Sequence, residues 1–389
     1  MKIKVIGTGA AGNKAAIMLL EKDILDESQV KLVNSTARDI PEKYRSNAII
    51  FEETDGGCGK ETSLGKELAI EALQTDDRFD SFIDQDDEAL IIVTSTEGGT
   101  GCGSSVILAD YYSSTTGIQI QIFAFTGFEE DGRGLQNTIE FFQAMKEEYT
   151  VNIISNIKFL ESNPNKLRAQ IAANEDFCER IKVLIADGII DSEQNIDKTD
   201  LYKVVNTPGY STILKTNLGK IKNVDNFNKI CSDMIDNDKS LETTEKSAKR
   251  IAVFINATED TLNNMDLTFS IIKNKMGVPY ELFNHIQCDE QSPESIAIIV
   301  SGMKLPLDVL EEIYDKYKEE SKKVNKNKDS FFDRASELKG NSEDDMFNSG
   351  ISRRRQTNKA VNKQTFFDKL KQDSEKEKQI KEDTIIDKF

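Results

Sequence analysis

Short apolar runs alternate with amphipathic segments along the first 160 residues. These strand-like segments fall at 2–6, 30–33, 89–93, 118–125 and 151–156, of which 89–93 is continuously apolar and 118–125 alternates apolar with polar residues. Continuous apolar runs are typical of strands buried on both faces of a parallel sheet, and the segments between them have the spacing of helices. The pattern therefore predicts an α/β domain built on a parallel sheet.

The character of the chain changes beyond residue 173. Apolar residues at helical spacing predict one long helix, and two buried strands alternating with helices predict a smaller α/β domain after it. Lys, Asn, Ser and Asp then predominate, which predicts disorder. The predicted parts are 1–173, a long central helix at 174–192, a second domain at 193–305, a C-terminal helix at 306–320 and a disordered tail at 321–389. We expect each of the two domains to have its own core.

The densest glycine cluster follows the strand at 89–93. It contains Gly98, Gly99, Thr100, Gly101 and Cys102 and leads into a helix. Glycines let a ligand approach the backbone, and the N–H groups at a helix N-terminus attract anions. The cluster therefore predicts a phosphate site. The lysine of a Walker-type P-loop is absent, which argues against that class of nucleotide hydrolase.

Two more glycine loops accompany this cluster. The first comprises Gly9, Ala10, Ala11, Gly12 and Asn13, and the second, at 54–60, contains Gly57, Cys58 and Gly59. With Gly7, the first loop matches G-x-G-x-x-G, so an NAD-binding Rossmann oxidoreductase is an alternative interpretation. That interpretation expects a carboxylate at the end of the second strand, where this chain has Asn34.

Composition limits the chemistry. The formal net charge of −18 argues against direct nucleic-acid binding by the whole chain. Five cysteines without a CxxC pair argue against a disulfide scaffold or a zinc module and for the cytoplasm, and no secretory signal or membrane-spanning run is present. Because His285 is the single histidine, His-based metal sites and Ser-His or Cys-His catalysis are disfavoured.

Two motifs resemble those of the tubulin and FtsZ superfamily. Residues 97–103, E-G-G-T-G-C-G, resemble its signature loop G-G-G-T-G-[ST]-G, with Glu97 and Cys102 as departures. Residues 195–200, N-I-D-K-T-D, resemble its synergy loop N-x-D-x-x-[DE]. The resemblance covers about residues 1–305 and implies a tubulin/FtsZ-like, Rossmann-type GTPase domain with a parallel sheet, a long central helix and a smaller second domain. The divergent base contacts and the long polar tail look most like the plasmid- and phage-encoded TubZ branch.

The resemblance also assigns roles to residues. It implies GTP or GDP between the three glycine loops, with Mg²⁺ carried by the phosphates. It implies that Glu129 and Arg133 contact the sugar and its surroundings, that Asn156 contacts the base and that Phe177 stacks on the base. Ile181 stands where the family reads guanine, and Arg180 and Asn174 are candidates to replace that contact.

Catalysis is implied to be shared between molecules. Asn195, Asp197 and Asp200 would reach the nucleotide of the neighbouring subunit and orient the attacking water. GTP hydrolysis would then require head-to-tail assembly into filaments. A partial second match at 223–228 ends in an amide, which accepts no proton from water, so it is the weaker candidate.

The tail carries a basic cluster, 353–355, and two near-repeats, S-F-F-D-R at 330–334 and T-F-F-D-K at 365–369. Paired phenylalanines in a polar segment predict docking motifs that fold on binding, although a biased composition also produces such repeats by chance. The resemblance implies a DNA-binding adaptor of the TubR type as partner, and segregation of plasmid or phage DNA. An FtsZ-like role in cell division and a non-polymerising nucleotide sensor are the alternatives.

Overall fold

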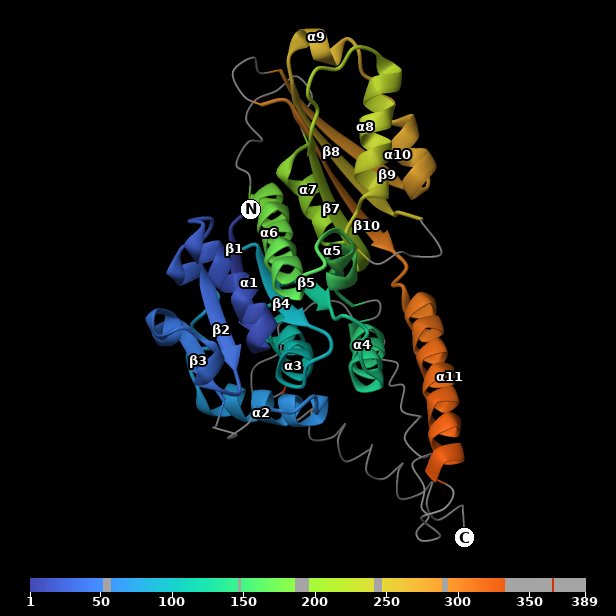
Figure 1. The fold of residues 1–389 in the computed structure, drawn as a ribbon. Coiled ribbons are helices and arrows are strands. Elements are labelled where there is room, and N and C mark those ends of the chain that lie inside the picture. The colour runs from blue at the N-terminus through green and yellow to red at the C-terminus, as the bar shows by residue number, and fades with distance from the viewer. Residues whose placement is uncertain are drawn as a thin grey trace, which may run out of the picture.

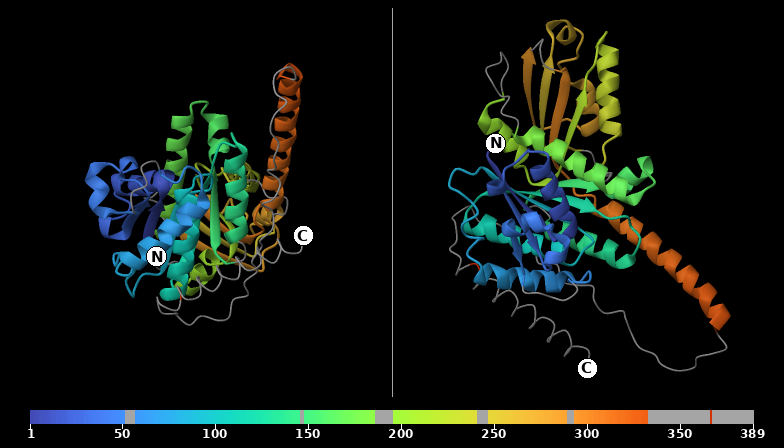
Figure 2. Two further views of the ribbon diagram at one scale, coloured as in Figure 1. Left: turned by 90° about the horizontal axis from the view of Figure 1, so that it is seen from below. Right: turned by 60° about the vertical axis from the view of Figure 1, so that its left-hand side comes forward.

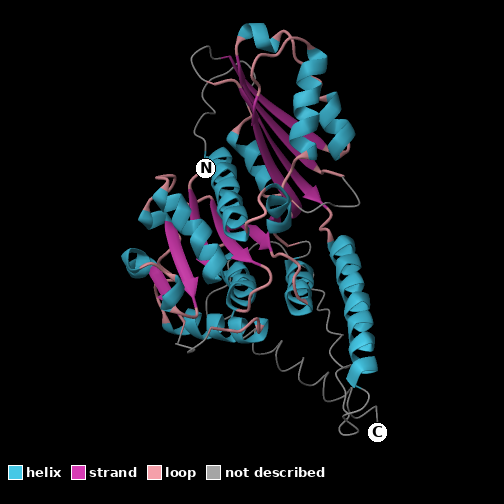
Figure 3. Ribbon diagram, viewed as in Figure 1, coloured by secondary structure: helices cyan, strands magenta, loops and turns pink. Residues whose placement is uncertain are grey.

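The computed structural model describes residues 1–51, 57–145, 148–185, 196–240, 247–288, 293–332 and Phe366. Strands and helices alternate along the chain (Figures 1 and 3). The strands are β1 Ile3–Thr8, β2 Val30–Asn34, β3 Ala48–Ile50, β4 Ala89–Ser95, β5 Gln119–Thr126, β6 Thr150–Ser155, β7 Gly209–Asn217, β8 Arg250–Ala257, β9 Glu281–Cys288 and β10 Ser295–Met303. The α-helices are α1 Gly9–Glu21, α2 Thr62–Thr75, α3 Thr100–Thr115, α4 Gly132–Met145, α5 Asn156–Ser162, α6 Lys166–Ile185, α7 Lys198–Val205, α8 Val224–Asp236, α9 Glu259–Leu262, α10 Ser270–Met276 and α11 Leu307–Phe332.

The strands form one continuous sheet in the order β3-β2-β1-β4-β5-β6-β7-β10-β8-β9. Strands β1 to β7 run parallel, β10 is antiparallel to both of its neighbours, and β9 is parallel to β8. Figure 1 shows α1 to α4 around the first strands and α8 and α10 beside the last ones, with α6 between the two groups. The predicted α/β fold with a parallel sheet, a long central helix and a smaller second part is confirmed.

The prediction of one core per domain is wrong. Two hydrophobic clusters are present, and each takes residues from both halves of the chain: Ile6 and Ile298 belong to one, and Val5 and Ile299 to the other. Successive residues of a strand point to opposite faces of a sheet. Because the sheet continues through both halves, the two clusters follow its two faces.

Two helix boundaries differ from the prediction. The central helix begins at Lys166 rather than at residue 174, because Asn165 caps it by accepting a hydrogen bond from the backbone N–H of Arg168 at 3.2 Å. The C-terminal helix continues to Phe332 rather than residue 320, because its charged residues are good helix formers. The rest of the predicted tail, 333–389, lies outside the described residues except for Phe366.

Helix α11 projects along the side of the molecule formed by α4 (Figure 2). The two helices touch where the ring of Tyr317 covers Gly132, since a Cβ at Gly132 would lie 2.5 Å from Cε1 of that ring. Among the described residues, we find no helix with the length and apolar character that a membrane span requires.

Candidate nucleotide site

Two glycine loops meet at the carboxyl ends of β1 and β4. Helix α1 begins at Gly9 directly after β1, and α3 begins at Thr100 shortly after β4. Gly9 has a φ of +68°, and a Cβ there would lie 2.9 Å from the backbone of Gly101. Neither helix has an acidic residue in its first turn. Free N–H groups and the positive dipole ends of both helices therefore meet in one place, which suits an anion.

The glycines of this region serve two different purposes. A Cβ at Gly12 would lie 2.1 Å from the carbonyl oxygen of Val93, and one at Gly99 would lie 2.7 Å from Cβ of Cys58. These glycines let loops and helices pack closely. In contrast, a Cβ at Gly98 or Gly59 would meet nothing within 4 Å. The backbone is thus open to a ligand at Gly98 and Gly59.

A hydroxyl pair joins the glycine loop to the end of β2. The Oγ1 atom of Thr100 lies 2.7 Å from Oγ of Ser35. A Cβ at Gly57, whose φ is +73°, would lie 3.6 Å from the same Ser35 oxygen, so the second glycine loop lies over this pair. Residues 52–56 of that loop, including the predicted Thr54 and Asp55, lie outside the described residues. Ser35 was not predicted as a site residue, because short hydroxyl side chains after a strand are also common in turns.

Ion pairs connect the loop after residue 57 to the start of α4. Nζ of Lys60 donates to Oδ2 of Asp131 at 2.5 Å, and Nη2 of Arg133 donates to Oε2 of Glu61 at 3.2 Å. The Lys60 bond holds the pKa of Asp131 below its ordinary value. The side chain of Arg133 is 41% exposed, so it remains accessible to a ligand.

Two carboxyl groups lie half-buried at the same place. The carboxyl of Glu97 fits against Gly127 and Gly134, and Oε1 of Glu97 accepts a hydrogen bond from the backbone N–H of Glu129 at 3.4 Å. Burial raises the pKa of Glu97, although the positive charge of Lys60 opposes this. Burial also raises the pKa of Glu129, and the nearby Glu97 raises it further. A carboxylate in place of the signature glycine is tolerated because two glycines make room for it away from the helix N-terminus.

The buried position of Cys102 contradicts a side-chain contact with phosphate. Its Sγ donates to the carbonyl oxygen of Asn137 at 3.8 Å, and burial raises the pKa of its thiol to about 12. Only the backbone N–H of Cys102, in the first turn of α3, is placed to face an anion. Cys58 is also buried, with 4% of its surface exposed.

The prediction that Asn13 binds the ligand is wrong for its side chain. Nδ2 of Asn13 donates to the carbonyl oxygen of Val33 at 3.1 Å, and Oδ1 accepts from the N–H of Val33 at 3.3 Å. Asn13 is fully buried. Its amide therefore joins α1 to β2 and has no group left for a nucleotide.

The prediction that Phe177 stacks on a base is also wrong. Phe177 is fully buried, and its ring makes edge-to-face contacts with Phe123 and Phe125 at centroid distances of 5.1 and 6.1 Å. Because α6 starts earlier than predicted, Phe177 lies in the middle of the helix and packs on β5. No ring face is left for a base.

The first turns of α6 expose apolar side chains instead. Leu167 is 65% exposed and Ile171 is 44% exposed, one turn apart. Nζ of Lys166 lies 5.4 Å from the ring centroid of Phe128, so these turns adjoin the segment before α4. Neither residue was predicted from the sequence, although Asn165 as the helix cap would have located both.

Asn156 is the first residue of α5, directly after β6, as the predicted strand end requires. Its Nδ2 donates to the carbonyl oxygen of Thr126 at 2.8 Å. Its Oδ1 is buried and has no hydrogen-bond partner among the described residues. One acceptor atom of Asn156 is therefore unsatisfied among the described residues.

The acidic residues of the predicted synergy loop surround the start of α7. Asp197 caps this helix, with Oδ1 accepting from the backbone N–H of Asp200 at 2.7 Å, and Oδ1 of Asp200 accepts from Nζ of Lys203 at 2.8 Å. Asn195 lies outside the described residues. In the weaker second match, Asn223 caps α8 in the same way, with a bond of 2.8 Å from the N–H of Asn226.

Helix α7 lies at the amino end of β4, whereas the glycine loops lie at the carboxyl ends of β1 and β4. The hydroxyl of Tyr202 donates to the carbonyl oxygen of Glu88, the residue before β4, at 3.3 Å. The glycine loop of 98–102 follows the other end of β4. Seven residues of strand span roughly 20 Å. Asp200 and the glycine loops of the same molecule are therefore too far apart to act on one phosphate.

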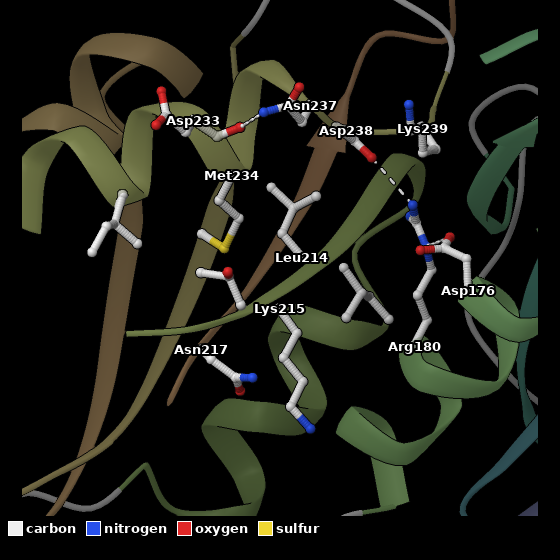
Figure 4. Close-up of a pocket in the computed structure, with 13 residues that line it drawn as sticks. Asp176, Arg180, Leu214, Lys215, Asn217, Asp233, Met234, Asn237, Asp238 and Lys239 are labelled. Carbon is white, nitrogen blue, oxygen red and sulfur yellow. Dashed lines mark hydrogen bonds and ion pairs between the residues drawn. The ribbon is translucent and has the colours of Figure 1, made fainter. Parts of the chain in front are cut away.

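A separate pocket of about 400 Å³ lies between α6, β7 and α8 (Figure 4). Arg180 reaches its rim and donates to Oδ2 of Asp176 at 2.7 Å, to Oδ1 of Asp238 at 3.1 Å and to Oγ1 of Thr212 at 2.9 Å. Burial alone would lower the pKa of Arg180, but the two carboxylates raise it and determine the net direction. Arg180 is buried and paired within this network, which argues against its reading the base.

No protein-family profile matches the chain. The chain is 26% identical over 223 residues to cell division protein FtsZ 1 of Methanocaldococcus jannaschii, a match that covers 54% of this chain and 58% of the relative. The chain thus spans little more than half the length of the curated relatives it matches.

Solved structures match more of the chain. CetZ2 from Haloferax volcanii, in a GTPγS-bound protofilament, matches with a TM-score of 0.65 and 17% identity over 82% of this chain and 100% of that one. TubZ of Bacillus thuringiensis serovar israelensis, in a GTPγS-form protofilament, matches with a TM-score of 0.67 and 15% identity over 84% of this chain and 94% of that one. The chain therefore has the tubulin/FtsZ fold. Its structural neighbours are tubulin/FtsZ-family proteins, with CetZ and FtsZ as similar to it as TubZ.

Proposed function

We propose that this protein binds GTP, assembles head to tail into filaments and hydrolyses GTP at the contact between subunits. The proposal rests on one observation: Asp197 and Asp200 lie near the amino ends of the parallel strands, and the glycine loops lie at their carboxyl ends. A heterologous contact between successive copies would bring these two ends of the sheet together, and such a contact need not close into a ring.

The phosphates of GTP would occupy the convergence of the N-termini of α1 and α3. Gly98 and Gly59 leave the backbone accessible there. Mg²⁺ prefers oxygen ligands and retains several waters, so it needs few protein groups besides the phosphates. The hydroxyls of Ser35 and Thr100 are the nearby oxygen donors that fit this need.

The sugar and base would extend toward α4 and α6. Glu129 and the accessible guanidinium of Arg133 would contact the sugar. On the base side, Asn156 offers its free acceptor atom, and Leu167 and Ile171 offer an apolar surface. This set replaces the predicted contacts by Asn13 and Phe177.

Hydrolysis would be completed by the next subunit. Phosphoryl transfer depends mainly on positioning and electrostatics, with little covalent work by the protein. The carboxylates of Asp197 and Asp200, with Asn195, would orient the water that attacks the γ-phosphate. The structural neighbours CetZ2 and TubZ, both seen as protofilaments with GTPγS, support such assembly.

We further propose that the filament is cytoplasmic and segregates plasmid or phage DNA through a TubR-type adaptor bound to the tail. The net charge of −18 disfavours direct DNA binding, whereas the tail has its own basic cluster at 353–355. The similarity to FtsZ 1 of Methanocaldococcus jannaschii favours cell division as the second candidate. Truncation after Phe332 separates the roles: adaptor and DNA capture should be lost while GTP affinity, measured by calorimetry, is unchanged.

A mixing experiment tests the shared catalytic site. Asp200→Ala keeps its glycine loops, and Gly98→Val keeps Asp200 but blocks the open backbone. Each variant alone should hydrolyse little GTP, whereas an equimolar mixture should recover activity because one supplies the nucleotide and the other the carboxylate. A mixture of Asp197→Ala and Asp200→Ala is the control and should recover nothing. Failure of the first mixture to recover activity would overturn the proposal.

A further inference from the structure

Phe366, a residue of the predicted tail, packs into the hydrophobic core of the folded part of the chain. Phe366 is 5% exposed and belongs to the hydrophobic cluster that contains Tyr111 of α3. The two ring centroids lie 5.4 Å apart with the planes inclined at 76°. Edge-to-face pairs of this geometry add stabilisation to the burial of their area. Phe366 is therefore anchored to α3.

The receiving surface is held in shape independently of the tail. The rings of Tyr111 and Tyr112 are edge to face, with centroids 5.3 Å apart. The hydroxyl of Tyr111 donates to the carboxylate of Asp80, and that of Tyr112 donates to the carbonyl oxygen of Phe79 at 2.9 Å. The hydroxyl ends of both rings are thus held by groups outside the tail.

The charges of the tail and of this surface are complementary. Between 361 and 372, Lys363, Lys369 and Lys371 against Asp368 give a net charge of +2. The surface carries the carboxylates of Asp80 and Asp110, the latter accepting from the hydroxyl of Tyr149 at 2.6 Å. Attraction between them should weaken with added salt.

The contact lies away from the glycine loops, toward the C-terminal end of α3. Helix α3 is about 24 Å long, and Tyr111 is in its last turns. The residues after Tyr111, Ser113 and Gly117, line a small cavity together with Asn206 and Pro208, which follow α7. The end of α3 that binds Phe366 thus leads toward the amino ends of the parallel strands.

We propose that the surface around Tyr111 is a docking site for the chain's own segment 363–371, with Phe366 as the anchor. The same segment is then held on the body and withheld from any other partner. This inference does not depend on GTP binding or hydrolysis.

The chain contains no tryptophan, so a single introduced indole reports on the site. We expect the emission of full-length Phe366→Trp to be blue-shifted and its quenching by acrylamide to be several-fold weaker than that of Phe331→Trp, the matched change in the near-repeat. Equal quenching of the two indoles would overturn the assignment to Phe366. Protection that disappears on tenfold dilution would instead show that a second copy supplies the tail.

Hydrogen exchange gives a second measurement that does not require the larger tryptophan side chain. In Phe366→Ala, amides of residues 107–115 should exchange about tenfold faster, as expected for loss of a buried aromatic anchor, and Phe331→Ala should match the wild type. A synthetic peptide of residues 363–371 should restore slow exchange in Phe366→Ala, less effectively at high salt. Unchanged exchange in Phe366→Ala would refute the docking.

Discussion

The hydroxyl of Tyr202 lies 3.3 Å from the carbonyl oxygen of Glu88, which fixes α7 at the amino end of β4. The carboxyl end of β4 leads to Gly98 and the start of α3. The two ends of one central strand thus carry the two halves of the proposed active site. In the proposed head-to-tail stack, the start of β4 in one copy would face the end of β4 in the next.

Replacement of Asp200 by alanine should slow GTP hydrolysis by about 100-fold, the usual effect of removing a group that orients or deprotonates the nucleophile. Filaments should last longer because turnover limits their disassembly. Phosphate release and sedimentation measure the two effects. The fold should tolerate the change, since the Asp200–Lys203 pair is exposed and contributes less than about 1 kcal/mol.

Lys203→Ala is the matched control, because it breaks the same ion pair and leaves the carboxylate in place. It should hydrolyse GTP at a rate near that of the wild type. Asp197→Ala is a less direct probe, since loss of this helix cap alone costs about 1 kcal/mol. Unchanged turnover per filament in Asp200→Ala would remove Asp200 from the mechanism.

Neighbouring glycines should respond differently to substitution. Gly98→Val should leave the melting temperature nearly unchanged, because the space around Gly98 is open. The same change should lower GTP affinity about tenfold or more, because the added side chain keeps the ligand from approaching the backbone. Gly99→Ala should lower the melting temperature, because its Cβ would lie 2.8 Å from the backbone N of Glu61. Scanning fluorimetry and calorimetry separate stability from binding. Full GTP affinity in Gly98→Val would place the phosphates elsewhere.

Local patterns in the sequence predicted the glycine loops and seven of the ten described strands, because each depends on neighbouring residues, but β3, β7 and β9 were not predicted. The errors arose where distant contacts decide. Phe177 and Asn13 are of residue types expected in a nucleotide pocket. However, Phe177 packs against Phe123, and the side chain of Asn13 hydrogen-bonds to the backbone of Val33. The sequence also did not show which glycines allow close packing and which leave the backbone open to a ligand, because that depends on which helices and loops pack together.

Glu97→Gln should stabilise the protein at neutral pH. Burial raises the pKa of Glu97 above its ordinary value of 4.5, so the folded state holds the ionised carboxylate less well than the unfolded state does. That cost is fully present above the folded-state pKa and disappears as the pH falls below the unfolded-state value. The melting temperature of Glu97→Gln should therefore exceed that of the wild type at pH 7 to 8, and the difference should vanish toward pH 4. A difference that grows on acidification would contradict the burial of this carboxylate.

Arg180→Met should destabilise the fold by about 3 kcal/mol, because it leaves two carboxylates in a partly buried site without their cation. Arg180 is 4% exposed, and its partners Asp176 and Asp238 lie on α6 and after α8, so the network joins the central helix to the second half of the chain. Lys182→Met, on the same helix, removes a cation from the exposed pair with Glu179 and should cost less than about 1 kcal/mol. Urea unfolding of both variants measures the difference. Equal stability of the two variants would show that the Arg180 network is not a link between the halves, whereas a large loss confined to Arg180→Met identifies it as the electrostatic contact that holds α6 against β7.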